Sequence, residues 1–312
     1  MVISAGAKKG VKRRRWKRES LFHNNVGYLY LLPWLVGFLV LQLYPFAASL
    51  YYSLTDYSMV KTTHFLGIRN YVQILTSDSV FRNSLAVTIK YVLFTVPLKL
   101  AFALFIAVLL NMNIRAIGAF RVLYYLPSIL GGSVGVAILW RFLFNRRGVL
   151  NLILGSLGVG PIDFLGSPQL TLYTISFISV WQFGSSMVLF LAALKDVPGE
   201  LKEAALIDGA NRWQVFWNVV FPMITPIVFF NLISQTISAL QQFSAPFLIT
   251  NGGPLNTTYL YGLMLYDNAF KFLKMGYACA QSWILFSIIL VFTALIFKSS
   301  PYWTYYEDGG DL

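Results

Sequence analysis

Six long apolar runs constrain the fold of this chain more than any other feature of its sequence. Each run is long enough to cross a bilayer, because a spanning α-helix needs about 20 consecutive apolar residues. Long runs without short alternating segments favour helices over a β-barrel. We therefore predict an all-α integral membrane protein whose residues 28–298 form six transmembrane helices. The runs lie near residues 28–54, 84–110, 119–140, 170–194, 222–248 and 277–298.

Charged side chains are scarce in this chain and avoid the apolar runs. Charged residues make up 12% of the sequence and apolar residues 57%, whereas soluble domains carry about 25% charged residues. All 12 acidic residues and both histidines lie outside the six runs. A proton-driven carrier or an intramembrane hydrolase uses such groups inside the bundle. We therefore expect no catalytic residue and, with a single cysteine, no metal site.

The sequence also lacks the phosphate-binding pattern G-x-x-x-x-G-K-[ST]. The chain itself is thus expected to bind neither ATP nor Mg²⁺, and uphill transport would draw its energy from a partner. A sodium-coupled carrier would use interrupted helices at corresponding places in two halves, and we find no such pair in the sequence. A secondary carrier of a polar solute, acting without an ATPase, is the alternative function.

A basic N-terminal tail, residues 1–27, sets the expected orientation. Its cluster KKGVKRRRWKR spans residues 8–18, and basic clusters beside a first span favour the cytoplasmic side. With six spans, the C-terminal tail, residues 299–312, returns to the same side. The tail is expected to contact anionic lipid rather than nucleic acid, because no folded basic domain accompanies it. Both termini are therefore predicted to be cytoplasmic.

The loop at residues 195–221 is more polar than the runs on either side of it. Glu200 suits the first turn of a helix, where a negative charge meets the positive end of the helix dipole. Gly209 supplies the left-handed residue that commonly ends a helix. Asn211 can cap a second helix, and Gln214 completes an approximate capping box. We predict a helix, a glycine turn and a second helix on the cytoplasmic side.

Small residues at the bend of this hairpin, Ala204, Ala205 and Gly209, allow another protein to approach its backbone closely. Large apolar residues on the same segment permit a second interpretation, in which the hairpin rests on lipid as an interfacial helix. These residues are Leu201, Trp213, Phe216 and Trp217. Spacing alone does not separate protein docking from lipid contact.

Four ordered stretches of the sequence resemble a single family. EAALIDGANRWQVFWNVVFPMITP, from residue 203, is similar to the coupling-loop motif of inner-membrane permease subunits of binding-protein-dependent ABC importers, in the form seen in the carbohydrate branch. The other stretches resemble that branch's first span, its third span with the following loop, and its last external loop with the sixth span. They read PWLVGFLVLQLYPFAASLYYSLTDYS, LPSILGGSVGVAILWRFLFNRRGVLN and NGGPLNTTYLYGLMLYDNAFKFLKMGYACAQSW. The chain looks like a maltose-type permease that lacks a large folded external insertion.

The resemblance implies a type I ABC importer permease fold in a bacterial inner membrane. It also implies a second permease subunit, two ATPase subunits that bind ATP and Mg²⁺, and an extracytoplasmic solute-binding protein. Residues 199–217 would form coupling helices seated in a cleft of the ATPase. The residues carried over to that loop are Glu203, Ala204, Ala205, Asp208, Gly209 and Asn211. The chain would thus be a non-enzymatic translocation subunit for sugars or oligosaccharides.

A polar stripe follows the fifth run. Asn231, Gln235, Ser238 and Gln242 recur at helical spacing and so share one face of a continuous helix. Such a stripe is costly in lipid and should face protein or water. Because amides and hydroxyls suit sugar hydroxyls, the stripe is a candidate substrate pathway. Hydrogen bonding between helices is the alternative.

Lys99 lies near the middle of the second run, where a lysine costs about 2.5–3.5 kcal/mol on insertion scales. We expect its side chain to face the solute cavity or a partner group, whereas Lys90 can extend to the membrane surface. These lysines, with the arginines expected outside, favour an anionic saccharide such as a uronic-acid oligomer. The arginines are Arg141, Arg146 and Arg147. A neutral oligosaccharide is the alternative substrate.

Overall fold

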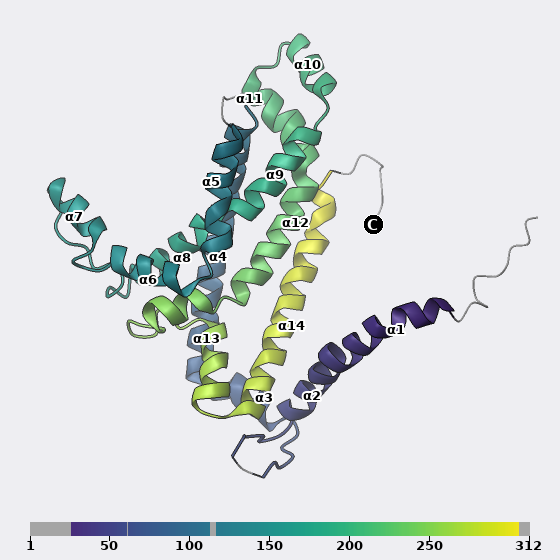
Figure 1. The fold of residues 1–312 in the computed structure, drawn as a ribbon, viewed down its shortest axis with the longest axis vertical. Helices are drawn as coiled ribbons and strands as arrows, with labels where there is room; N and C mark the ends of the chain where they lie inside the picture. The colour runs from purple at the N-terminus through teal and green to yellow at the C-terminus, as the bar shows by residue number, and fades with distance from the viewer. Residues whose placement is uncertain (1–25, 61, 113–116, 306–312) are drawn as a thin grey trace, which may run out of the picture. The chain divides into compact units, whose positions relative to one another are not determined.

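The computed structural model describes residues 26–60, 62–112 and 117–305 (Figure 1). By internal contacts the chain divides into two compact units, residues 1–49 and 50–312, which are described separately. Within the described residues every regular element is helical, and an isolated antiparallel bridge pairs Thr55 with Phe65. The predicted all-α class is therefore confirmed.

The first unit carries most of one apolar helix. α1 (Val26–Phe38) continues through the π-helical turn η2 (Leu39–Leu43) into α2 (Tyr44–Ser53), whose last residues belong to the second unit. Residues 30–53 of this helix are long and apolar enough to cross a membrane. The predicted first span is therefore helical over its described length. The basic cluster at residues 8–18, which predicts the orientation, lies outside the described residues, and α1 begins within the last two residues of the predicted tail.

Three long helices dominate the second unit. They are α4 (Ser79–Leu110), α12 (Phe221–Leu240) and α14 (Met275–Ser299). α4 packs against α12 and against two shorter helices, α8 (Thr171–Trp181) and α9 (Gly184–Asp196). The largest apolar core forms where these elements meet, because α4 buries aliphatic side chains along one side. The second and sixth predicted spans are thus continuous helices.

The third and fourth predicted spans are broken. α5 (Ile117–Leu130) and α6 (Val134–Leu143) meet at an angle of 101°, and α8 and α9 meet at 47°. The predicted span over 119–140 is therefore not a single straight helix, and the sequence-based search for interrupted helices missed both breaks. The described residues contain four helices that could each cross a membrane, or up to six if each bent pair forms one span.

The fifth span ends earlier than its hydropathy predicts. α12 stops at Leu240, and the chain turns before a second helical segment that includes η4 (Pro246–Thr250). The apolar run to residue 248 therefore combines a helix end with a separate element. Gln242 lies beyond α12, so placing it on the same helix face as Gln235 was wrong.

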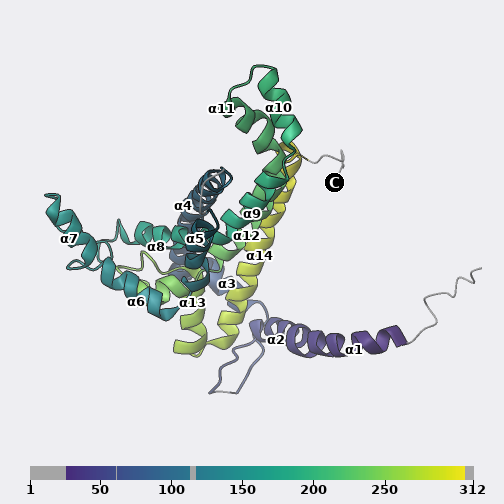
Figure 2. The same cartoon turned by 45° about the horizontal axis from the view of Figure 1, so that its top comes forward.

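The second unit has two distinct ends. At one end lies the hairpin of α10 (Gly199–Ile207) and α11 (Arg212–Val215), and the C-terminal end of α14 lies on the same side (Figures 1 and 2). The backbone N–H of Tyr305 donates to Thr225 Oγ1 at 2.9 Å, which holds the described C-terminal end near the start of α12. The opposite end holds α3 (Arg69–Thr76), α13 (Tyr261–Tyr266) and η5 (Asp267–Lys271). α7 (Val149–Ser156) follows α6.

Candidate functional site

The hairpin has the local geometry that its sequence predicts. Gly209 adopts φ +90°, a left-handed conformation that side chains disfavour, and it ends α10. Asn211 Oδ1 accepts from the Gln214 backbone N–H at 2.9 Å, and Gln214 Oε1 accepts from the Asn211 N–H at 2.8 Å. This reciprocal pair is a complete capping box, so both helix ends at the bend are fixed locally.

Most side chains of the hairpin are exposed in the described part of the chain. α10 buries no residue, and its predicted docking positions are exposed except for Ala205, which is partly buried and packs against the main core. Ile207 is 86% exposed and Trp213 is 70% exposed. An exposed surface with small residues and a few large apolar ones suits either protein docking or lipid contact.

The hairpin is joined stiffly to the bundle. α11 continues through the π-helical turn η3 (Phe216–Val220) into α12, so residues 212–240 form one helix. Val215 and Val220 are buried on this helix, where they belong to the main core. On the other side, only Val197 and Pro198 separate α9 from α10. A displacement of the hairpin would therefore move α9 and α12 directly.

A polar cavity lies inside the second unit, away from the hairpin. Its volume is about 160 Å³, and α4, the break between α8 and α9, and the end of α12 line it. Four predicted pathway residues meet there, namely Lys99, Gln235, Ser238 and Gln242. Gln242 reaches the cavity because the chain turns after Leu240, not because a helix continues.

Asn231 does not line this cavity. It is 1% exposed, and its side-chain N–H donates to the Ile227 carbonyl one turn earlier, at 3.0 Å. The three arginines predicted to lie outside the membrane are also elsewhere, exposed near the end of α6 and in the turn before α7. Asn231 thus satisfies its donor within its own helix, and the cavity's positive charge comes from Lys99.

Four polar residues that the sequence did not single out complete the cavity wall. They are Tyr91, Thr95, Ser179 and Gln182. Tyr91 Oη donates to Ser179 Oγ at 2.7 Å and so joins α4 to α8. Gln182 interrupts a long apolar run, and this amide was the available sequence signal for a polar site.

The two broken spans meet beside the cavity. Gln182 Nε2 donates to the Gly131 carbonyl at 3.4 Å, a long contact, and Ser185 N–H donates to Ser128 Oγ at 3.2 Å. Each bond joins one break to the other. Non-helical backbone at membrane depth is tolerated where protein buries it or where it lines a water-filled cavity. The breaks therefore explain how polar backbone groups can lie near Lys99.

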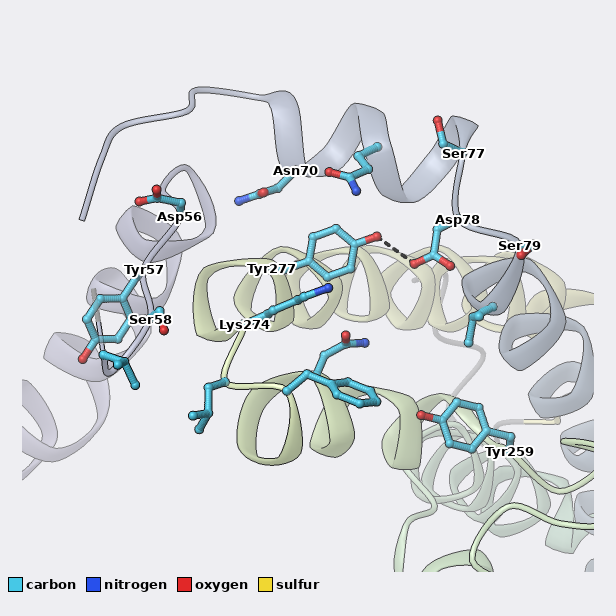
Figure 3. Close-up of a pocket in the computed structure, with 16 residues that line it drawn as sticks. Asp56, Tyr57, Ser58, Asn70, Ser77, Asp78, Ser79, Tyr259, Lys274 and Tyr277 are labelled. Carbon is cyan, nitrogen blue, oxygen red and sulfur yellow. Dashed lines mark hydrogen bonds between the residues drawn. The ribbon is translucent and has the colours of Figure 1, made fainter. Parts of the chain in front are cut away.

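A larger cavity of about 910 Å³ opens at the end opposite the hairpin, and Figure 3 shows its lining. Asp78 caps α4 by accepting from the Phe81 N–H at 3.0 Å, and it also accepts from Tyr277 Oη at 2.7 Å. The second bond joins α14 to the start of α4. Lys274 and Tyr259 line the same space.

Most polar groups in this larger cavity already have protein partners. Burial, assisted by a hydrogen bond to Asp267 at 2.8 Å, raises the pKa of Tyr259, so its hydroxyl stays protonated. The backbone N–H of His64 donates to Asp56 and lowers the pKa of that exposed carboxyl. Asn70 is buried and donates to the Ser53 and Thr55 carbonyls. These bonds hold helices together, so the lining is primarily structural.

Replacing Asp78 with alanine should destabilise the bundle. The change removes the cap of α4, which contributes about 1 kcal/mol, and it leaves Tyr277 without its acceptor. The unfolding midpoint of the purified chain in detergent would measure the loss. Asp163→Ala is the control, because Asp163 is exposed and, among the described residues, its carboxylate accepts a hydrogen bond from the nearby Gly166 N–H alone. Equal midpoints for the two variants would contradict the role of Asp78.

The sequence of this chain is similar to the sequences of known transport proteins. A family model described as "Binding-protein-dependent transport system inner membrane component" matches residues 81–300. The chain is 45% identical over 296 residues to the probable ABC transporter permease protein YesP of Bacillus subtilis (strain 168), covering 94% of this chain and 96% of the relative. It is 32% identical over 276 residues to the trehalose/maltose transport system permease protein MalF of Thermococcus litoralis, covering 88% and 92%.

A solved structure has a similar fold. A chain from a bacterial ABC transporter involved in the import of the acidic polysaccharide alginate matches with a TM-score of 0.76 and 21% identity, covering 90% of this chain and 96% of that chain. At this identity the likeness concerns the fold alone. It agrees with the all-helical permease architecture predicted from the sequence.

Proposed function

We propose that this chain, which belongs to the family of binding-protein-dependent transport system inner membrane components, has a specific role in transport. It is the translocation subunit of an ATP-driven sugar importer. The proposed transport mechanism rests on one structural observation. An exposed helical hairpin at one end of the bundle is continuous with α12 and separated from α9 by two residues. A partner that moves the hairpin can therefore reorient the helices around the Lys99 cavity.

The hairpin is the docking element for a cytoplasmic ATPase subunit in this proposal. Glu203, Ala204, Asp208 and Gly209 offer a small, polar surface, and the capping box at Asn211 keeps it rigid. ATP-driven closure of two ATPase subunits would bias the permease between inward and outward access, with a second permease subunit completing the pathway. ATP and Mg²⁺ would be bound by those subunits, and this chain would catalyse no reaction.

The position of the hairpin also predicts which end of the second unit faces the cytoplasm. If it faces the cytoplasm, the C-terminal segment that contacts Thr225 lies on the same side. The larger cavity and the external segments then face an extracytoplasmic solute-binding protein. These segments comprise residues 55–83, 141–169 and 249–276. Both termini would be cytoplasmic in an inner membrane that the chain crosses six times, with each bent pair as one span.

Sugars and oligosaccharides are the proposed substrates. The MalF relative is named for trehalose and maltose transport, and a permease of Rhizobium radiobacter that is 33% identical is named for lactose transport. The cavity at Lys99 supplies amides and hydroxyls, which can pair with sugar hydroxyls. These residues are the proposed pathway in this chain.

Co-purification tests the importer proposal directly. The tagged chain should be extracted from its native membranes in mild detergent, and its partners identified by mass spectrometry. We expect an ATPase subunit with a phosphate-binding loop and a second permease. Isolation of the chain alone, under conditions that keep other membrane complexes intact, would contradict the proposal. Solute uptake by the chain in vesicles without ATP would instead support the secondary carrier considered from the sequence.

Gln235→Ala and Gln242→Ala should each lower sugar uptake. Each amide can form one or two hydrogen bonds with a sugar, and loss of about 1 kcal/mol corresponds to about fivefold. Uptake rates in cells, normalised to the amount of chain in the membrane, would measure this. Gln241→Ala is the matched control, because Gln241 neighbours Gln242 but is exposed and does not line the cavity. Unchanged uptake in both cavity variants would remove these glutamines from the pathway.

A further inference from the structure

Lys99 is the one charged residue that lines the 160 Å³ cavity; the other polar residues are glutamines, hydroxyl-bearing residues and a tyrosine. In the described part of the chain, the single ion pair joins His64 to Asp56, so no carboxylate balances Lys99. A lysine within a membrane span is costly unless water or a counter-charge surrounds it. The cavity therefore has a net positive charge that the described chain does not neutralise.

Two side-chain amides in the cavity lack a protein partner as well. Gln235 and Gln242 line the cavity, and their side-chain amides form no hydrogen bond with the described residues. Groups that serve to hold helices together are normally paired, as Tyr91 is with Ser179. Unpaired groups converging on one space indicate a binding site.

We propose that this cavity binds the carboxylate of an acidic sugar residue, with Lys99 as its counter-charge and the glutamine amides as partners for the ring hydroxyls. The proposal rests on the proposed function, because it names the substrate class of the same pathway. A single lysine matches the single charge of a carboxylate, whereas a phosphate monoester carries about two charges and attracts further cations. The volume equals about five water molecules, which limits the site to part of an oligosaccharide.

Two other arrangements would also accommodate Lys99 in the membrane, and two experiments distinguish each of them from a carboxylate-binding site. In the first, the second permease subunit supplies a carboxylate that pairs with Lys99, and the cavity carries no positive potential. In the second, the lysine only maintains packing, and its replacement affects every substrate equally. Lys90 provides a matched control for both, because it lies on the same helix but is exposed and does not line the cavity.

The first test measures the charge of the cavity without any substrate. Cys279 is the single cysteine in the sequence, so Cys279→Ser followed by Ser238→Cys places one thiol in the cavity wall. Anionic and cationic methanethiosulfonates are then reacted with the intact complex. We expect Lys99→Gln to lower the ratio of anionic to cationic labelling rates by about tenfold, while Lys90→Gln leaves it unchanged. The same ratio with and without Lys99 would overturn the proposal.

The second test measures selectivity in the complex reconstituted with its binding protein. The probes are a neutral hexose oligomer and the same oligomer oxidised at C6 to carboxylates. We expect the wild type to take up the oxidised oligomer, and Lys99→Gln to reduce that uptake by about tenfold or more relative to uptake of the neutral oligomer, with Lys99→Arg less affected. Equal loss for both oligomers, or no loss, would overturn the proposal.

Failure of this inference is distinguishable from failure of the proposed function. If an ATPase co-purifies and the neutral oligomer is transported but the oxidised one is not, the importer stands and the carboxylate site is wrong. If no ATPase co-purifies and neither oligomer is transported, both proposals fail together.

Discussion

Ala204→Arg should abolish coupling of the chain to the proposed ATPase subunit while leaving the chain folded. Ala204 is exposed in the middle of α10, and an arginine there changes helix propensity little. A side chain of this size would prevent close approach of a partner to the hairpin backbone. Because a central interface residue contributes about 2 kcal/mol or more, we expect the ATPase affinity to fall by about thirtyfold. Co-purification and sugar uptake should be lost together.

Two further variants separate docking from general damage. Ser156→Arg places the same side chain at an exposed position in α7, remote from the hairpin, and should retain the ATPase. Gly209→Ala should weaken coupling by a different route, since the φ of +90° costs an alanine about 1–2 kcal/mol and would reorient α10 against α11. Full ATPase retention by Ala204→Arg, with normal uptake, would contradict docking and favour lipid contact at the hairpin.

The hairpin could be predicted in detail because its signals are local. A glycine that needs positive φ and a reciprocal Asn211–Gln214 pair act within a few residues, whatever the surrounding fold. The long helices were likewise predictable, since hydropathy over about 20 residues detects any helix that can face lipid. α4 and α14 match their predicted runs closely for this reason.

The helix breaks were not predictable from hydropathy, because an apolar run keeps the same mean hydropathy whether it is straight or bent by 101°. Gly131, Gly132 and Ser133 at the first break, and Gln182 at the second, were the local signals. The helical spacing that grouped Gln242 with Gln235 assumed a helix that ends at Leu240. The grouping was still useful, because the turn after Leu240 returns Gln242 to the same cavity.

Gly184→Leu should separate α5 from α9 and collapse the arrangement of the two broken spans. A Cβ at Gly184 would lie 2.6 Å from the Tyr124 carbonyl oxygen and 2.8 Å from Tyr125 Cα, so the α5 backbone itself would have to shift. Overpacking of this kind costs about 1–3 kcal/mol. It should also displace the Ser128–Ser185 hydrogen bond near the cavity. We therefore expect a lower unfolding midpoint in detergent and a large loss of uptake.

Gly135→Leu is the matched control for this prediction. Gly135 lies in the first turn of α6, as Gly184 does in α9, but a Cβ there meets no atom within 4 Å. Both substitutions replace glycine with leucine in the first turn of a helix, so both raise helix propensity by the same amount. The difference between their unfolding midpoints therefore measures the effect of the close approach of α5 and α9. If both variants unfold together and transport equally, the crossing is not tight and the breaks would owe their geometry to the second permease subunit. A selective loss at Gly184 would instead mean that this chain alone holds the two breaks beside Lys99.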